Sequence, residues 1–570
     1  MRLKMPNIIR QVLAAAAVLP AALALLSVSS CQKQEALHYS PEDLELEMLI
    51  KDYLEADYTS SIGNVTVTPD KVTVSGHYSG SGKFYVAEIP PYMDLLRLDE
   101  PLSVFRPDEA SFSFETARYV ETEGGISYDR LLSKWAIFEE GTDGDILVSD
   151  ARYADVVPAV SSPEPVPLRG KKGIGGIFMN DRISDFDELS AGSATLNLFV
   201  TQFTYLSPGD GRIAHEYGGR TYWFDENFIV DNLDRVLEET GRRNMCVAGI
   251  LLVQNESTAM DKELARLLTD PGYTGGGTLI MPNMTSPESV NCFAAIVDFL
   301  VSRYTREDGR YGRISHWIVL NEVDGASSWA NMGTRPQYYC TDYYIKVLRL
   351  VNNILRQYDG NAETFASFTH SWTLAALDYP AREMIETIDA MGKKEGDYRW
   401  ALAVHSYPWD LLNPRCWECP YSTPSMDAQC VSFRNLEVLD KWIRMPEHRY
   451  GGTLKRSVWL SEAGLNSKSY SEADLEEQAA GTAYAWKKVE ALEGIDAWQW
   501  HNWFDNTGDG TGAMLGLRKF REGYGGEAKP SWHVFKAAGT ADEDACFSRY
   551  LGYLGLGSWD EIMYEDADID

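Results

Sequence analysis

Apolar and polar residues alternate along the early part of the chain, beginning near residue 60. Val65 and Val67 alternate with polar neighbours, and after a turn Val72 and Val74 repeat the pattern. Further short runs of this kind lie at 83–89, 111–114, 135–139 and 146–148. The pattern predicts a small β-sandwich-like domain over residues 60–165, which could bind carbohydrate or brace a neighbour. Because no strand face gathers aromatic residues, we favour bracing.

The rhythm changes after a proline-rich stretch at 163–167, where apolar runs begin to alternate with helical periodicity. The expected strands lie at 173–180, 194–203, 246–254, 315–321, 364–370, 400–405, 457–462 and 495–501. The expected helices lie at 224–240, 286–304, 337–358, 381–391, 433–444, 472–493 and 531–538. This predicts an α/β fold, a (β/α)8 TIM barrel over residues 166–545, followed by an acidic C-terminal tail, 546–570.

A doubly wound open sheet is the rival interpretation of the same alternation. Such a sheet usually shows a phosphate-binding glycine loop after its first strand. The glycines of the segment 173–176 lie before or within the first expected strand rather than at its end. The barrel is therefore the better prediction.

The N-terminus is typical of a targeting segment. Positive residues precede an apolar run at 12–26, which is short for a membrane span. The run is followed by Val28-Ser29-Ser30-Cys31, which resembles a bacterial lipobox. The resemblance implies a signal peptide, 1–30, cleaved before a lipidated Cys31, and then a tether with a short helix over 31–59. We expect an exported bacterial lipoprotein of the cell envelope, held to the membrane by lipid; an ordinary signal peptide with a chance cysteine is the alternative.

The composition of the chain limits the classes of molecule that it is expected to bind. The formal net charge is −32, which argues against nucleic acid, because phosphates need Lys and Arg. The 16 Trp and 31 Tyr suit flat sugar rings, or simply a large aromatic core. Seven cysteines follow Cys31, and the group Cys416, Cys419 and Cys430 could suggest zinc. No fourth ligand is evident nearby, so a local disulfide or reduced thiols is the better expectation.

Two strand ends carry the candidate chemistry. Asn321 and Glu322 close the fourth apolar run, and Glu462 closes the seventh. Catalytic groups of such barrels lie at the carboxyl ends of the strands, and strands four and seven face each other across the ring. Two facing carboxylates suit the cleavage of a glycosidic bond, in which one donates a proton and the other attacks or activates water.

These motifs resemble clan A, the large group of retaining barrel glycosidases, as do the segments His405-Ser406-Tyr407-Pro408 and Trp498-Gln499-Trp500. The resemblance implies a retaining glycoside hydrolase acting on a poly- or oligosaccharide without cofactor or metal. By its pattern Glu322 is the acid/base and Glu462 the nucleophile. Asn321 would bind the sugar 2-hydroxyl, and His405 or Tyr407 would orient Glu462. Trp500 would stack under the sugar, unless Trp498 or Trp503 does.

Further candidates for substrate binding are His370, His501 and Trp329, which follow other strand ends. One departure from the clan is that the second strand lacks the Arg often found near its end. The segments 131–135 and 149–153 also resemble an uncharacterised family of bacterial barrel lipoproteins.

Two other functions stay open at this point. One is a non-catalytic glycan-binding lipoprotein on a barrel scaffold. The other is a metal-dependent hydrolase that gathers His370, His405 and His501.

Overall fold

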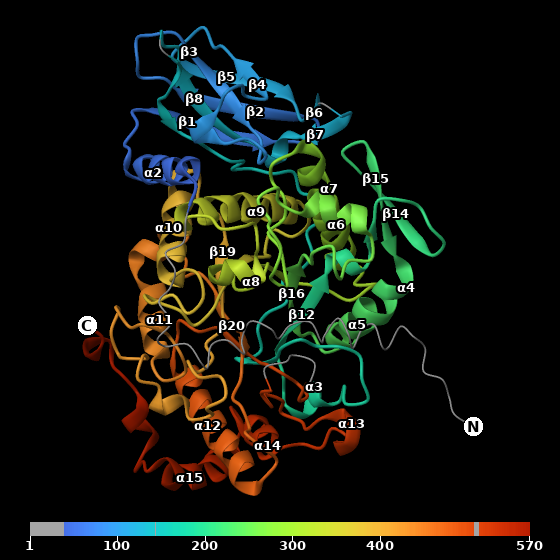
Figure 1. Ribbon diagram of the computed structural model, residues 1–570, viewed down its shortest axis with the longest axis vertical. Helices are drawn as coiled ribbons and strands as arrows, with labels where there is room; N and C mark the ends of the chain where they lie inside the picture. The colour runs from blue at the N-terminus through green and yellow to red at the C-terminus, as the bar shows by residue number, and fades with distance from the viewer. Residues whose placement is uncertain (1–38, 123, 143, 507–511) are drawn as a thin grey trace.

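The computed structural model describes residues 39–122, 124–142, 144–506 and 512–570. The expected signal peptide and Cys31 lie outside these residues. A β-rich N-terminal domain lies at one end of the molecule, the barrel lies in the middle, and a group of C-terminal helices lies at the other end (Figure 1).

The N-terminal domain contains two four-stranded sheets after an opening helix, α2 (Pro41–Glu55). One sheet has the order β10 (Ser149–Asp150), β1 (Ser60–Val67), β2 (Lys71–His77), β5 (Ser111–Ala117). The other has the order β4 (Ser103–Phe105), β3 (Phe84–Ile89), β8 (Lys134–Glu139), β9 (Ile146–Leu147). A two-stranded ribbon, β6 (Tyr119–Thr122) with β7 (Ile126–Asp129), lies beside them. The alternating valines Val65, Val67, Val72 and Val74 are buried in one cluster with Trp135, which confirms the predicted β domain.

Eight parallel strands form a closed ring, which confirms the TIM barrel. They are β11 (Lys172–Ile174), β12 (Ser193–Phe199), β16 (Cys246–Leu252), β17 (His316–Val319), β18 (Thr364–Phe368), β19 (Trp400–Val404), β20 (Val458–Ala463) and β21 (Ala497–Trp500). Every residue of β16, β18 and β19 is buried, as expected for parallel strands covered on both faces.

Helices surround this ring. The longer ones are α5 (Arg235–Arg242), α7 (Pro287–Tyr304), α9 (Gln337–Tyr358), α10 (Ala381–Lys394), α11 (Leu436–Arg444), α12 (Glu472–Ala491), α14 (Pro530–Ala537) and α15 (Glu543–Leu554). Shorter ones are α3 (Asp185–Glu188), α4 (Glu226–Ile229), α6 (Lys262–Leu268), α8 (Ala326–Trp329) and α13 (Arg521–Tyr524). Most of the buried apolar residues of the helices and strands form one continuous core.

The segment after β12 differs from the prediction. The expected helix 224–240 begins only at Glu226, because Phe224 belongs to β15 (Arg220–Asp225). This strand pairs with β13 (Thr204–Tyr205) and β14 (Arg212–Tyr217), and Phe224 stacks on Phe299 of α7 with ring centroids 3.7 Å apart. The first barrel strand is also shorter than predicted.

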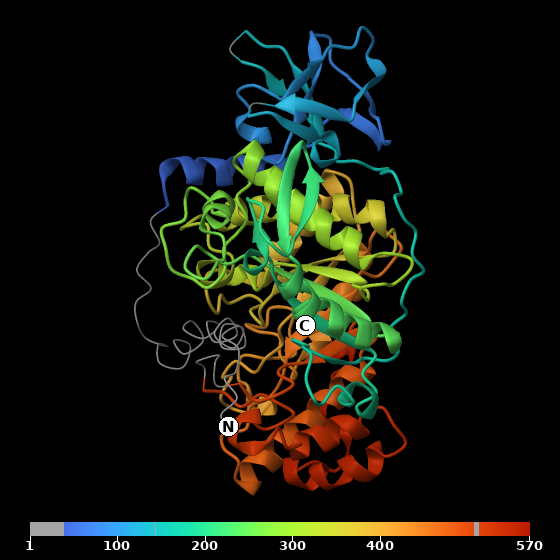
Figure 2. The same cartoon turned by 90° about the vertical axis from the view of Figure 1, so that its right-hand side faces the viewer.

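The β14–β15 hairpin reaches the N-terminal domain (Figure 2). At its tip the Gly218 carbonyl accepts a hydrogen bond of 3.0 Å from the Ser127 amide. Buried polar contacts join the domains elsewhere: Lys134 pairs with Glu395 at 2.6 Å, and Arg118 donates to Gln357 at 2.7 Å. These contacts favour bracing as the role of the N-terminal domain.

The last residues fold back onto the barrel. Helix α15 extends across residue 545, where the sequence suggested that a tail begins. Near the end of the chain, Lys441 Nζ donates to the Ile569 carbonyl at 2.7 Å, and the Met426 amide donates to the Asp570 carbonyl at 2.8 Å. Among the described helices, none combines the length and the apolar character needed to cross a bilayer.

Candidate active site

The fourth barrel strand ends in an unusual backbone conformation. Leu320 and Glu322 both have positive φ angles, 63° and 39°, a region that side-chain-bearing residues rarely adopt. The Glu322 amide donates to Ser367 Oγ of β18 at 3.1 Å. Such conformations persist where the surrounding structure enforces them, and they cluster at functional sites. Ser367 was missed in the sequence, where the only signal is a polar residue inside an apolar strand.

The two predicted carboxylates meet at His405. Its Nδ1 lies 2.7 Å from Glu322 Oε1 and 3.9 Å from Glu462 Oε2. Since both distances start from one atom, these two carboxylate oxygens are at most about 6.6 Å apart. Retaining glycosidases hold their carboxyl groups about 5–5.5 Å apart and inverting ones about 6.5–9.5 Å apart. The upper limit of about 6.6 Å therefore allows all the carboxyl separations of retaining enzymes, but only the shortest separations of inverting ones.

Glu462 has three polar neighbours. Tyr407 OH donates to its Oε1 at 3.1 Å, His501 Nε2 lies 3.7 Å from the same oxygen, and His405 lies on the other side. Burial alone would raise the pKa of this carboxyl, but His501, His405 and the Tyr407 hydrogen bond outweigh it and lower the pKa. All eight predicted barrel strands are present, and the second of them, β12, contains no Arg.

The histidines of the site differ in charge. Burial opposes protonation of His405, but Glu462 and Glu322 outweigh it and raise its pKa. Burial, with a smaller contribution from His405, lowers the pKa of His370 to about 4. The raised pKa of His405 favours its charged form beside Glu462, whereas His370 is mostly neutral near pH 7.

Two acids near the barrel mouth turn out to be structural. Asp324 is 1% exposed and accepts hydrogen bonds from the backbone and side chain of Thr369. Burial raises its pKa to about 7, although the Thr369 bonds oppose the shift. Asp505 forms a fully buried ion pair with Lys529 at 2.7 Å. Neither carboxyl is placed to contact substrate directly.

The tryptophans predicted to stack on sugar are buried. Trp500 is 0% exposed, donates from its indole to the Leu515 carbonyl at 2.9 Å and packs against Phe535. Trp329 is 1% exposed and lies in the apolar cluster of the barrel interior. The prediction that Trp500 stacks on sugar is therefore wrong, and so is the prediction that Trp329 contacts substrate. Trp498 and Trp503 are equally buried, at 0% and 1%.

Trp409, which follows strand six, remains partly open. Its centroid lies 5.6 Å from that of His370 and 4.8 Å from that of Tyr421. Asn321, the residue before Glu322 in the chain, is buried, with 7% of its surface exposed. Trp409 is thus a better candidate for sugar stacking than Trp500, and it was visible in the sequence only as one of several aromatic residues after strand ends.

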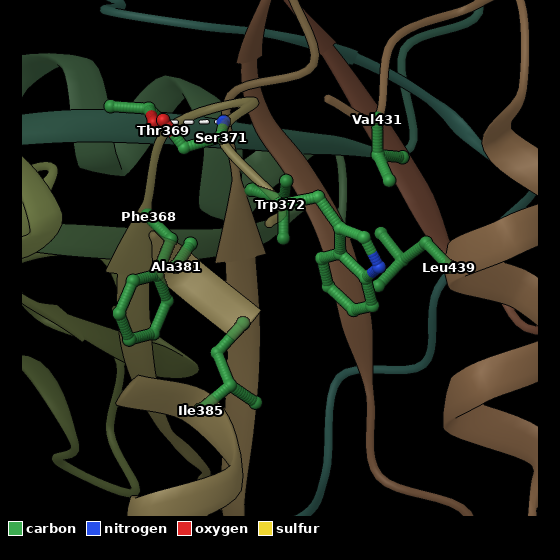
Figure 3. A pocket seen from close by; sticks show the side chains of 9 residues that line it. Phe368, Thr369, Ser371, Trp372, Ala381, Ile385, Val431 and Leu439 are labelled. Atoms are coloured by element: carbon green, nitrogen blue, oxygen red, sulfur yellow. Dashed lines mark hydrogen bonds between the residues drawn. The ribbon is translucent and has the colours of Figure 1, made fainter. Parts of the chain in front are cut away.

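Strands β18 and β19 and helices α10 and α11 leave a small apolar gap of about 10 Å³ between them. Figure 3 shows Trp372, Ile385 and Leu439 around it. The gap is about the size of a water molecule, so it is a packing feature rather than a substrate site. Within the described ranges, no group of three or more His, Cys, Asp and Glu side chains is arranged to hold a metal ion.

Comparison with known structures returns glycoside hydrolases. A family 39 glycoside hydrolase from Bacteroides cellulosilyticus WH2 is 13% identical, with 84% of this chain and 83% of that chain covered and a TM-score of 0.40. A β-glucuronidase from Bacteroides uniformis is 11% identical, with 84% and 49% covered and a TM-score of 0.37. A β-glucuronidase from Ruminococcus gnavus, in complex with uronic deoxynojirimycin, is 11% identical, with 84% and 68% covered and a TM-score of 0.34.

All three TM-scores lie below 0.5, so the barrel assignment comes from the strand pairing itself. No curated protein matches the chain. A family model does match residues 164–562, more than half of the 570 residues. The segments 131–135 and 149–153, which suggested an uncharacterised family in the sequence, lie outside this match. The chain belongs to the matched family, a family of unknown function (DUF5722).

Proposed function

We propose that this protein is a retaining glycoside hydrolase that cleaves a poly- or oligosaccharide by double displacement. The single observation that carries the proposal is that Glu322 and Glu462 share His405, which limits the separation of two of their oxygens to about 6.6 Å. This separation suits a pair of carboxyl groups that work on one glycosidic bond.

The environment of Glu462 suits a nucleophile. Its lowered pKa keeps it ionised near neutral pH, so a carboxylate oxygen can attack the anomeric carbon while the bond to the leaving oxygen breaks. Tyr407 holds the oxygen Oε1 by a hydrogen bond. The product of this step is a glycosyl ester on Glu462.

Glu322 is the proton carrier in this scheme. It protonates the departing oxygen in the first step, and in the second it takes a proton from the water that attacks the glycosyl ester. The second step frees Glu462 and returns the sugar with its original anomeric configuration. The chemistry needs two carboxyl groups of this chain and no cofactor.

The cell-envelope location is a separate proposal. Its support is the sequence around Cys31, which predicts lipid attachment and export. In this setting the substrate would be a glycan encountered outside the cytoplasm. Labelling with a radioactive fatty acid, compared between wild type and Cys31→Ser, tests the anchor.

The test of the activity is a panel of aryl glycosides and polysaccharides offered to wild type, Glu322→Gln and Glu462→Gln. The exposed loop acid Asp410 follows strand six and provides a matched control, Asp410→Asn. We expect turnover in wild type and the control, and a loss of about 10³-fold or more in both Glu variants, since each removes a group that acts in the transition state. Proton NMR of the first product should show the retained anomer.

The alternative is a glycan-binding protein without catalysis. Affinity electrophoresis in gels that contain each polysaccharide separates the two functions. Retardation of all four proteins, together with no hydrolysis of any substrate by wild type, would replace the enzyme with a binder.

A further inference from the structure

The long loop after strand six contains two thiols in contact. Cys419 Sγ and Cys430 Sγ are 3.9 Å apart, and both residues are buried. Ser422 Oγ bridges them, at 3.2 Å from the first sulfur and 3.1 Å from the second. The third cysteine of the loop, Cys416, is also buried.

The two thiols belong to different sides of the loop. Cys430 pairs as a β-bridge with Ser371, in the segment that follows strand five, and the next amide, that of Val431, donates to the His370 carbonyl at 2.9 Å. Cys419 lies on the outgoing arm, where its carbonyl accepts a hydrogen bond from Arg434. A covalent link between them would therefore fasten the outgoing arm to the segment that carries His370.

We propose that Cys419 and Cys430 are a disulfide-forming pair whose bond holds the Trp409–Tyr421 rings beside His370. This is a modification site, and it stands independently of the glycosidase proposal. Tyr421 lies inside the ring that the bond would close, and its carbonyl already accepts from the Cys430 amide at 3.3 Å. Trp409 contacts the Tyr421 ring.

The reaction needs a modest movement. A disulfide has a sulfur–sulfur length of about 2.05 Å, so the two sulfurs must approach by somewhat less than 2 Å, which side-chain rotation can supply. Both thiols lose their protons, one S–S bond forms, and two electrons pass to the disulfide of a small-molecule or protein exchange partner. That partner leaves as two thiols, which balances the step.

The surroundings favour Cys419 as the thiolate that starts the exchange. The Cys430 thiol donates a hydrogen bond to it, and Ser422 and the amides of Tyr421 and Trp409 add to the effect. Together they overcome burial and lower the pKa of Cys419 to about 5. A low pKa makes a cysteine a competent partner in disulfide exchange near neutral pH. The pKa of Cys430 is raised, first of all by the same hydrogen bond.

The chemical test is peptide mapping of the purified full chain after equilibration with oxidised glutathione and alkylation under denaturing conditions. Trypsin cuts after Arg415 and Arg434 and leaves all three loop cysteines in one peptide, which cyanogen bromide divides at Met426. We expect the two halves to stay linked until a reductant is added, with one alkylated thiol. The link should persist in Cys416→Ser and be lost in Cys419→Ser and Cys430→Ser.

Three results would overturn the pair. The first is that Cys419 and Cys430 are both fully alkylated after oxidation. The second is that the link between the two half-peptides disappears in Cys416→Ser. The third is that the protein binds stoichiometric zinc, which protects these thiols from alkylation.

The structural half of the proposal is tested by hydrogen exchange of residues 409–432. We expect faster exchange on reduction in wild type and in Cys416→Ser, and fast exchange under both conditions in Cys430→Ser. If the bond forms but exchange does not respond to it, the holding role is wrong. None of these measurements depends on hydrolysis of a glycan.

Discussion

His405 allows a quantitative prediction, because one ring nitrogen lies near both candidate catalytic carboxylates. The replacement His405→Gln keeps a side-chain donor near Glu322 and removes the positive charge beside Glu462. At the acidic pH where Glu462 titrates, His405 carries its full charge, since its own pKa is raised. The variant therefore measures what that charge contributes to the ionisation of Glu462.

The size of the effect follows from the 3.9 Å separation of His405 Nδ1 and Glu462 Oε2. Two unit charges at that distance attract by about 4 kcal/mol at an effective dielectric constant near 20, and about 1.4 kcal/mol corresponds to one pKa unit. The upper limit is thus about 3 units. Because Tyr407 and His501 remain, we expect the pKa of Glu462 to rise by about 1–3 units.

The assay is the pH dependence of kcat/KM with an aryl glycoside that wild type hydrolyses. The acid limb reports protonation of the nucleophile, so in His405→Gln it should move to higher pH by that amount. His370→Gln is the matched control, and its acid limb should stay in place because the groups that lower the pKa of Glu462 are His501, His405 and Tyr407. An acid limb that does not move in His405→Gln, while the optimum rate falls, would refute this electrostatic role.

Three further predictions concern single contacts. Tyr407→Phe removes the hydrogen-bond donor at 3.1 Å from Glu462. Because hydrogen bonds to charged groups contribute about 1.5–3 kcal/mol, kcat/KM should fall roughly 10- to 150-fold. An unchanged kcat/KM would show that the bond is absent in solution. Lys529→Met leaves Asp505 buried without its ion-pair partner at 2.7 Å. Urea unfolding should show that the free energy of unfolding falls by about 3–5 kcal/mol, and that the double variant Lys529→Met/Asp505→Leu recovers most of this loss. Equal losses in the single and the double variant would contradict the pairing. The raised pKa of His405 means that its contribution to stability is complete below about pH 6.5 and is lost as the pH rises through the folded-state pKa. The difference in unfolding free energy between wild type and His405→Gln should therefore shrink as the pH rises above about 6.5, and a constant difference would argue against a charged His405.

Much of the barrel was predictable because parallel strands read as apolar runs that end abruptly. Glu322 and Glu462 stood out for this reason, since each is an acid directly after buried strand residues. The closed ring then brings distant strand ends together without any further information from the sequence. His405 and Tyr407 were expected beside Glu462 only from the resemblance to clan A.

The wrong predictions have physical causes. Alternation along β21 shows that Trp498 and Trp500 share one face, but not which face; packing against Phe535 of α14 shows that they face the helices. Gln499, between them, instead donates to Ser193 of β12, which lies beyond the neighbouring strand β11. The helix expected from 224 was too long because an apolar Phe224 fits a helical period as well as a strand. Such ambiguities are resolved only by tertiary contacts.

The hairpin between β14 and β15 has a consequence for shortened versions of this protein. A chain cut to the family-matched region, 164–562, would keep the hairpin but lose its support, leaving Gly218 without the Ser127 amide. Glu395 would also lose its ion-pair partner Lys134. The side of the barrel that the N-terminal domain covers would then expose unpaired charge and apolar surface to water. Natural homologues that lack the first domain should therefore show shorter hairpins and polar substitutions on α9 and α10, whereas truncated recombinant forms of this chain should aggregate.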